Sequence, residues 1–331
     1  MLKLFPSSPL LFSCFFLGTL IAISSSHWFF LWFGLELNLF SFIPILLSSS
    51  YSFEASIKYF LIQLFSSLML ISSVLSILIP SFKISNFIMM ILFSLSLMTK
   101  LSIAPCHFWF PSVLSSISWT TCLLLMTWQK LIPLLIMILI SPFYPLFIIF
   151  FLASVSSMVG GLGGMNQSQL RNLLAYSSIS HMGWTLSIIS ILPMMSFMYF
   201  FCYSIILFPL IYTLLSFNFI NNKQLFSLFS FNKPFYFLIC ISFLSLSGLP
   251  PLLGFFPKWM ILMYLSKCNF FLMSFFLILG SLFTLFFYLS MIFPSMSLMK
   301  MPSISLNFKA SSFLFWLFLF SLGILPVLTI F

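Results

Sequence analysis

Apolar segments of about 20 residues recur along almost the whole chain, and each is long enough to cross the roughly 30 Å of hydrocarbon in a bilayer. This repetition constrains the fold more than any other feature of the sequence. Of the 331 residues, 62% are hydrophobic and 4% are charged, whereas soluble domains carry about 25% charged residues. The composition therefore excludes a water-soluble globular chain and predicts an all-α, polytopic membrane protein.

Pro, Gly, Asn and Lys residues separate the apolar segments and set the predicted ends of the helices. They predict a single membrane domain over 1–331 with about 11 transmembrane helices and short loops. The predicted helices are 9–24, 27–47, 54–79, 86–117, 119–140, 143–164, 168–191, 195–219, 234–265, 269–293 and 310–331.

Two of these helices contain proline-rich interruptions, and we expect both to be discontinuous. The fourth helix contains KLSIAPCHFWFP, with Pro105, and the ninth contains SGLPPLLGFFPKW, with Pro250 and Pro251. Proline removes a helical hydrogen bond and clashes with the preceding turn. Unwound backbone at membrane depth is tolerated only where protein or a water-filled cavity satisfies its polar groups.

The two interruptions lie five helices apart, which suggests an internal repeat. A first five-helix unit would cover 9–140 and a second unit would cover 143–293, leaving 310–331 as a last helix. Because five is odd, the second unit would be inverted relative to the first. Paired interruptions in two inverted halves are typical of transporters, and they point to a transport pathway at the interface of the halves.

The basic residues in the loops predict the orientation of the chain. Seven lie on the side of the N-terminus and two lie on the other side, which indicates that the N-terminus faces inward. The seven are Lys3, Lys58, Arg171, Lys223, Lys233, Lys300 and Lys309, and the two are Lys83 and Lys267. Although the net charge is +10, the basic residues are scattered singly, so no nucleic-acid partner is expected.

Four ionisable residues lie within the predicted helices or beside their interruptions: Glu36, Lys100, Lys130 and Lys258. Lys130 lies about ten residues, or roughly 15 Å, from either end of its helix, too far for its side chain to reach the interface. A central charge costs about 2.5–3.5 kcal/mol, and intramembrane ionisable residues are functional candidates by default. We therefore expect these four to translocate protons. The alternative is a buried Glu36–Lys100 ion pair that only fixes helix packing.

A proton-transfer hypothesis follows from the pairing of Glu36 with Lys100. A nearby carboxylate favours the charged form of a buried lysine. At about 4 Å and an effective dielectric constant near 20 this coupling is roughly 4 kcal/mol, and moving a proton charge against about 180 mV costs roughly the same. Movement of Glu36 away from Lys100 would then release a proton toward Lys130 and Lys258.

The remaining chemical groups give weaker indications. His107 and His181 are candidates for proton relay because histidine titrates near neutral pH; a structural role is the alternative for both. Glu54 and Lys58 have the i, i+4 spacing of a helical ion pair, which favours a structural role. The six cysteines include no close pair, so no metal or iron–sulfur site is expected. The glycines in GGLGG, 160–164, lack the spacing of a nucleotide fingerprint and predict a helix end.

Several longer motifs together resemble the NADH dehydrogenase subunit 2 family of mitochondrial respiratory complex I. The motifs are spread over about residues 18–260 and are SSHWFFLWFGLELNLFSFIP, FEASIKYFLIQ, KLSIAPCHFWFP, TWQKLIPL, GGMNQSQLRNLLAYSSISHMGW and SLSGLPPLLGFFPKW. The resemblance implies an antiporter-like, proton-pumping subunit of NADH:ubiquinone reductase in the mitochondrial inner membrane, related to Mrp-type antiporter subunits. It places the N-terminus on the matrix side and the C-terminus on the intermembrane-space side.

The resemblance also implies which groups act and which partners are present. The family's key glutamate falls on Glu36, and its central lysines fall on Lys100, Lys130 and Lys258. No cofactor is expected in this chain, because NADH, FMN, iron–sulfur clusters and ubiquinone bind to other subunits. The expected partners are other complex I membrane-arm subunits, membrane lipids and protons.

The chain departs from the family at Ser102 and Cys106, where glycine and phenylalanine are usual. Two alternatives remain open on the residues alone. An Mrp-type cation/proton antiporter subunit would show sodium-dependent transport, and a structural scaffold would tolerate changes at Lys130 and Lys258.

Overall fold

The computed structural model describes residues 8–47, 52–78, 86–143, 146–222, 224–225, 233–250 and 252–297. Within these ranges the regular structure is helical, apart from one isolated β-bridge between Gln169 and Asn221. The predicted last helix, 310–331, lies outside the described residues, as do Pro251 and the loop lysines Lys3, Lys83, Lys223, Lys300 and Lys309.

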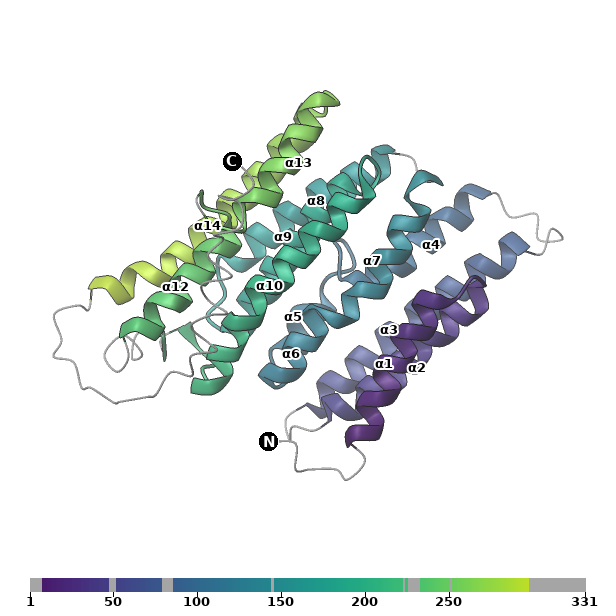
Figure 1. The fold of residues 1–331 in the computed structure, drawn as a ribbon, viewed down its shortest axis with the longest axis horizontal. Coiled ribbons are helices and arrows are strands. Elements are labelled where there is room, and N and C mark those ends of the chain that lie inside the picture. The colour runs from purple at the N-terminus through teal and green to yellow at the C-terminus, as the bar shows by residue number, and fades with distance from the viewer. Residues whose placement is uncertain are drawn as a thin grey trace. The chain divides into compact units, whose positions relative to one another are not determined.

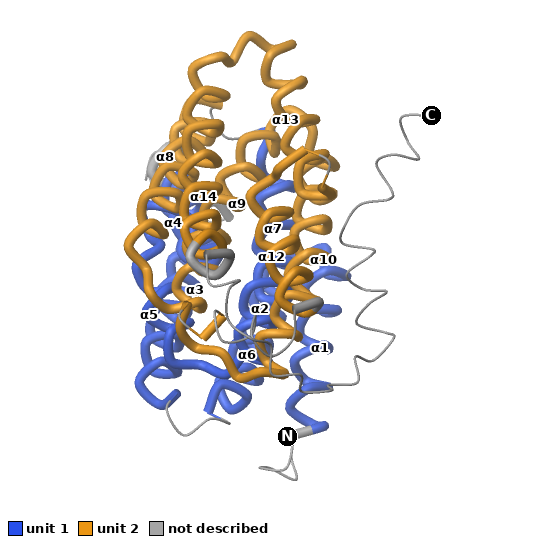
Figure 2. Tube along the Cα trace, turned by 90° about the vertical axis from the view of Figure 1, so that its left-hand side faces the viewer, with its two compact units in different colours: residues 1–144 blue, residues 145–331 orange. Residues whose placement is uncertain are grey.

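The chain divides into two compact units, residues 1–144 and 145–331, which Figure 2 distinguishes by colour. The helices of the first unit run along the chain as follows (Figure 1): α1 Ser8–Ser24, α2 Trp28–Leu46, α3 Phe53–Leu78, α4 Asn86–Leu101, α5 Trp109–Leu114, α6 Trp119–Met126, α7 Trp128–Ile140 and the short 3₁₀ turn η1 Ser141–Phe143. Within this unit α1 packs on α2, and α3 packs on both α2 and α4.

The second unit is built around one almost fully buried helix, α9. Its helices are α8 Leu146–Gly164, α9 Leu170–Ile189, α10 Pro193–Phe217, α12 Lys233–Ser247, α13 Phe255–Lys267 and α14 Phe271–Ser297. Helices α8, α10, α13 and α14 all pack against α9, which is buried from Leu173 to Ile189 apart from Tyr176. The predicted helix end at 160–164 is confirmed, since α8 ends at Gly164.

Six helical segments among the described residues are long and apolar enough to cross a membrane: 28–46, 53–76, 119–140, 146–164, 193–217 and 271–293. Shorter apolar helices cover 9–24, 89–101 and 235–247. All of these segments fall within the predicted transmembrane helices, apart from one or two residues at the starts of 53–76 and 193–217. The class of multi-pass, all-helical membrane protein is therefore confirmed.

Both predicted interruptions are present, and they share one local design. Helix α4 ends at Leu101 and α5 begins at Trp109, while α12 ends at Ser247 and α13 begins at Phe255. The two links, 102–108 and 248–254, therefore have the same length. Each begins with a residue in the left-handed region, Ser102 with φ 57° and Gly248 with φ 85°. In each, the next N–H returns to the preceding helix, from Ile103 to the Met98 carbonyl and from Leu249 to the Leu244 carbonyl, which is a Schellman-type helix cap.

A third interruption lies within the fifth predicted helix; the bounds 119 and 140 of this segment are confirmed, but the break inside it was not predicted. Thr127, with φ −111° and ψ −72°, separates α6 from α7. Its hydroxyl donates to the Leu123 carbonyl, and the Lys130 N–H donates to the Thr127 carbonyl at 3.2 Å. Pro133, which has no N–H for the Gln129 carbonyl, further weakens this stretch of the helix. Lys130 consequently stands in the first turn of a new helix.

Candidate functional site

The four predicted ionisable residues are all buried in the structure. Glu36, Lys100, Lys130 and Lys258 are 7%, 7%, 2% and 6% exposed, respectively. Glu36 lies in the middle of α2, and Lys100 lies in the last turn of α4. Lys130 and Lys258 lie in the first turns of α7 and α13, each directly after an interruption. Every one of the three lysines is thus close to a helix end, where backbone polar groups are not used by the helix itself.

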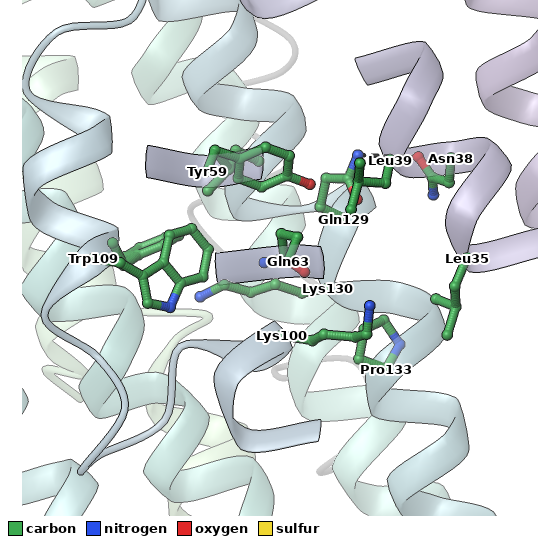
Figure 3. Close-up of a pocket in the computed structure, with 12 residues that line it drawn as sticks. Leu35, Asn38, Leu39, Tyr59, Gln63, Lys100, Trp109, Gln129, Lys130 and Pro133 are labelled. Carbon is green, nitrogen blue, oxygen red and sulfur yellow. Dashed lines mark hydrogen bonds between the residues drawn. The ribbon is translucent and has the colours of Figure 1, made fainter. Parts of the chain in front are cut away.

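The structure brings Lys100 and Lys130 together at one small polar cavity inside the first unit (Figure 3). The cavity has a volume of about 20 Å³, roughly the room that one water molecule needs. Its polar lining comes from Asn38 of α2, Tyr59 and Gln63 of α3, Lys100 of α4, and Gln129 and Lys130 of α7. Six helices of the unit, counting α5 with Trp109 and α6 with Leu125, therefore converge on the two amines.

Two amide side chains that line this cavity connect α2 with α7. Gln129 Nε2 donates a hydrogen bond to Asn38 Oδ1 at 3.0 Å, which joins residues 91 positions apart in the sequence. No role was predicted from the sequence for Asn38, Gln63 or Gln129. The signal was present, because each is an amide within an otherwise apolar run, but only the tertiary contact shows that the three share one cavity.

Lys130 is held against an aromatic ring. Its Nζ atom lies 4.4 Å from the ring centroid of Phe110, which belongs to the same unit. A cation–π contact of this kind contributes about 0.5–2 kcal/mol, the upper value applying to a desolvated site. Because a neutral amine gains much less from the ring, this contact stabilises the protonated form of Lys130.

Glu36 and Lys100 are both buried in the first unit but do not form a direct ion pair. No nitrogen and oxygen of these two described residues approach within 4.0 Å. Glu36 Oε1 is buried without a hydrogen-bond partner among the described residues. Glu36 also lines an open apolar groove between α2 and α3, beside Trp32 and Ser67. The carboxylate is therefore not fixed in a direct ion pair. The alternative, a Glu36–Lys100 pair that only fixes helix packing, would require one.

Lys258 is held by the helix interruption of its own unit. Its Nζ atom donates to the Ser247 carbonyl at 2.8 Å and to the Leu246 carbonyl at 3.3 Å. These are among the last carbonyls of α12, which carry the negative end of the helix dipole. A Cβ atom on Gly248 would lie 2.9 Å from Lys258 Cδ. Gly248 is therefore required both for its positive φ and for the approach of the lysine.

The two histidines occupy different surroundings. His107 lies in the link between α4 and α5, is 6% exposed, and packs against the Phe108 ring with a centroid distance of 4.2 Å. His181 lies on α9, also 6% exposed, and its Nδ1 atom is 2.7 Å from the hydroxyl of Tyr199. The contact with Tyr199 was not expected from the sequence.

The remaining carboxylate, Glu54, forms the expected pair on the surface. The structure shows a Glu54–Lys58 ion pair with side chains that are 79% and 47% exposed, which confirms the i, i+4 prediction. Within the described ranges, no group of three or more His, Cys, Asp or Glu side chains is arranged to hold a metal ion.

Taken together, the fold and the site define a class: a polytopic helical membrane protein with buried amines placed at interrupted helices. The chain belongs to the family described as "NADH:quinone oxidoreductase/Mrp antiporter, TM", whose model matches residues 25–284. It is 41% identical over 296 residues to NADH-ubiquinone oxidoreductase chain 2 of Lumbricus terrestris, with 88% of each chain covered. It is 39% identical over 302 residues to the protein of the same name from Equus asinus, with 86% of this chain and 87% of that one covered.

Solved structures show the same fold at low sequence identity. A chain of respiratory complex I from Thermus thermophilus superposes with a TM-score of 0.83 at 20% identity, covering 98% of this chain and 79% of that one. A chain of the Mrp complex from Dietzia superposes with a TM-score of 0.75 at 16% identity, covering 86% of this chain and 59% of that one. At these identities the likeness concerns the fold alone.

Proposed function

We propose that this chain is a membrane subunit of NADH-ubiquinone oxidoreductase and that it translocates protons through Glu36, Lys100, Lys130 and Lys258. Relatives at 37–41% identity over most of the chain are named NADH-ubiquinone oxidoreductase chain 2, which supports membership of that enzyme. The observation that carries the proton-transfer role is the cavity shared by Lys100 and Lys130, which is also lined by Leu35 and Asn38, close neighbours of Glu36 on α2.

In the first unit, the charge of Lys100 responds to the position of Glu36. When the carboxylate is near, it favours the ammonium form of Lys100; when it withdraws, the buried ammonium loses that stabilisation and releases a proton. The cavity gives this proton a polar route toward Lys130, past the amides of Asn38 and Gln129. The Phe110 ring then stabilises the charged form of Lys130. Lys258 carries protons in the second unit. There the carbonyls at the end of α12 stabilise its charged form, as the Phe110 ring does for Lys130.

The architecture that fits this role has about eleven transmembrane helices, in two inverted five-helix units followed by one last helix. The division of the chain near residue 144 supports two units. The matching links 102–108 and 248–254, with the same left-handed cap, support a common design for the discontinuous helices. Unwound segments of this kind bind ions in transporters built from inverted repeats.

The names of the relatives support a location in the mitochondrial inner membrane, and the distribution of basic residues in the loops supports an N-terminus on the matrix side. In this assignment the partners are other complex I membrane-arm subunits and membrane lipids. NADH, FMN, the iron–sulfur clusters and ubiquinone belong to other subunits, and the part of this chain is to move protons.

The test replaces Lys130 with Met and Glu36 with Gln in the assembled enzyme, and measures proton translocation in sealed vesicles together with NADH oxidation. Both variants are expected to lower the rate of proton translocation about tenfold or more, equivalent to roughly 1.4 kcal/mol of barrier. Lys58→Met, an exposed lysine on α3, is the matched control and is expected to leave the rate unchanged. Unaltered proton translocation in both variants of the buried residues would show that the four-residue scheme is wrong.

A cation/proton antiporter subunit of the Mrp type is the second reading, since the family description covers both kinds of protein. The identity of the relatives favours the respiratory enzyme. Proton movement that depends on sodium and not on NADH oxidation would favour the antiporter.

A further inference from the structure

Helix α3 contributes two polar side chains to the cavity of Lys100 and Lys130, and neither has a role in the scheme above. They are Tyr59 and Gln63, which are 3% and 6% exposed. The two residues are four positions apart, so they project from one face of α3. Gln63 is drawn between Tyr59 and the two lysines (Figure 3). Helix α3 therefore presents a hydroxyl and an amide to the space that the two amines share.

The ring of Tyr59 is held on two sides by aromatic neighbours. Its centroid lies 5.4 Å from that of Phe42 of α2 and 5.9 Å from that of Trp109 of α5. The Trp109 indole is itself fixed, because its Nε1 atom donates to the Thr99 carbonyl at 3.1 Å. Thr99 directly precedes Lys100 in the chain. Aromatic packing thus sets the position of the Tyr59 hydroxyl at the cavity.

The polar groups of these two side chains are not engaged elsewhere in the part of the chain that the structure describes. Gln63 accepts a hydrogen bond from Ser66 Oγ, but through its backbone carbonyl. Neither the Tyr59 hydroxyl nor the Gln63 side-chain amide bonds another described residue. The cavity volume of about 20 Å³ has room for one water molecule, which needs two to four polar partners. The hydroxyl, the amide and the two amines can supply them.

Among the described side chains that line this cavity, Tyr59 carries the one hydroxyl group. A hydroxyl can accept a proton on a lone pair while it gives up its own. The amides of Asn38, Gln63 and Gln129 can hold a water molecule, but an amide does not readily exchange a proton near neutral pH. The Trp109 indole only donates, and it is already bonded to a carbonyl. Apart from the two lysines, Tyr59 is therefore the lining side chain that is suited to pass a proton.

We propose that the Tyr59 hydroxyl passes protons from Lys100 to Lys130, and that Gln63 is a positioning residue for the water molecule that completes this path. The proposal rests on the proton transfer between the two lysines proposed above. The Lys100 ammonium gives a proton to the Tyr59 oxygen as the hydroxyl gives its own proton to the water. The water in turn gives one of its protons to the Lys130 amine. Lys100 becomes a neutral amine, Lys130 becomes an ammonium, and the hydroxyl and the water are restored.

The first experiment compares Tyr59→Phe with Ser73→Ala in the assembled enzyme. Tyr59→Phe keeps the ring between Phe42 and Trp109 and removes only the hydroxyl. The rate of proton translocation is expected to fall about tenfold or more, since a positioned proton-transfer group contributes about 10²–10⁴-fold to its step. Ser73 is the matched control, because it is fully buried on the same helix and its hydroxyl donates to the Leu70 carbonyl. Equal rates in the two variants would overturn the role of Tyr59.

The solvent deuterium isotope effect separates proton transfer from packing. In Tyr59→Phe the transfer between the lysines becomes the slowest step, so the isotope effect on translocation per assembled enzyme is expected to rise above the wild-type value. A lower rate with the wild-type isotope effect, or a loss confined to the amount of assembled enzyme, would show that the hydroxyl only supports the packing of α3. Gln63→Met removes the amide at similar length and gives a second measurement. A wild-type rate in Gln63→Met would overturn the role of Gln63.

A double-mutant cycle tests whether Tyr59 and Gln63 belong to one path. If they do, Gln63→Met has little further effect in the Tyr59→Phe background; additive effects would overturn the shared path. Lys130→Met distinguishes this inference from the proposed function. If Lys130→Met leaves proton translocation unchanged, the proposed function itself fails. If Lys130→Met lowers it while Tyr59→Phe does not, only the role of Tyr59 fails.

Discussion

At the scale of single residues, the three buried lysines are stabilised in three different ways. Lys130 lies over an aromatic ring, Lys258 donates to two backbone carbonyls, and Lys100 interacts with the Glu36 carboxylate without a direct pair. A ring and a helix end are fixed, whereas a carboxylate on a side chain can move. In the proposed mechanism, Lys100 is therefore the one of the three amines whose charge is controlled by a side-chain movement.

The hydrogen bond between Gln129 and Asn38 gives a prediction at this scale. Gln129→Leu leaves the Asn38 amide without its partner, and an unsatisfied buried polar group costs about 1–3 kcal/mol. The double variant Asn38→Leu, Gln129→Leu removes both partners, so we expect it to assemble better than either single variant. Both kinds of variant are expected to slow proton translocation, because the cavity loses polar lining.

The measurement is the amount of assembled enzyme, set against the rate of proton translocation per assembled enzyme. If the double variant regains both assembly and wild-type translocation, the two amides contribute only to packing and not to the proton route.

The sequence predicted the charged members of the site but not their polar surroundings. The burial of Glu36, Lys100, Lys130 and Lys258 followed from the cost of a charge far from a membrane surface. An amide or a hydroxyl costs much less to bury, so Asn38, Gln129 and Tyr59 did not stand out. Their roles depend on contacts between distant helices, which no local pattern contains.

At the scale of helices, the links 102–108 and 248–254 end the preceding helix with the same left-handed cap. The first residue of the two links differs. A left-handed backbone conformation costs a residue with a Cβ atom about 1–2 kcal/mol relative to glycine. Ser102, where relatives are expected to have glycine, bears that strain at φ 57°, and Gly248 avoids it at φ 85°. Ser102 Oγ donates to the Leu101 carbonyl, so the hydroxyl satisfies one of the unused acceptors at the end of α4.

Substitutions at Ser102 and Gly248 are expected to change the stability of the two links in opposite directions. Gly248→Ala adds a Cβ atom that would lie 2.9 Å from Lys258 Cδ and also imposes the left-handed strain. We expect it to displace the lysine and to lower both enzyme assembly and proton translocation. Ser102→Gly is expected to stabilise its link by about 1 kcal/mol, since it relieves the strain.

Enzyme assembly and its resistance to heat are the measurements for both caps. Ser102→Ala keeps the strain and contacts no lysine, so it serves as the control for a small change at a cap. Gly248→Ala with wild-type translocation would show that the approach of Lys258 to this link is not required.

The helices also show where sequence patterns were insufficient. Proline predicted the two links correctly: 102–108 contains one proline, Pro105, and 248–254 contains two prolines together with two glycines. Proline alone was not decisive, since Pro44 and Pro209 lie inside the continuous helices α2 and α10. The interruption at Thr127 was missed because no Gly or Pro stands at the break itself. Its local features are a threonine hydroxyl that donates to the Leu123 carbonyl and Pro133 a turn and a half later.

At the scale of the whole molecule, the distribution of basic residues predicts which side of the membrane each loop faces. Lys58, near the start of α3, and Lys267, at the end of α13, are both exposed. The predicted topology places them on opposite sides. A membrane-impermeant amine reagent is therefore expected to label Lys58 only from the matrix side and Lys267 only from the other side, as read by mass spectrometry of sealed vesicles of both orientations.

Labelling of both lysines from one side would contradict the predicted odd number of crossings between the matrix loop at Lys58 and the loop at Lys267. Exposed Arg and Lys residues elsewhere do not interfere, because each labelled peptide is identified by its own mass. The count of spans beyond α14 depends on the segment 310–331, for which the sequence alone predicts a helix.

The attachment of Lys258 to the end of α12 has a consequence for the whole cycle. A carbonyl dipole cannot gain or lose a proton and cannot diffuse away, so the environment that α12 presents is the same before and after Lys258 discharges. The neutral amine also retains hydrogens with which to donate to those oxygens. If Lys258 carries protons as proposed, its proton occupancy can therefore alternate many times while its surroundings stay the same, without a counter-ion that has to be reset at each turnover.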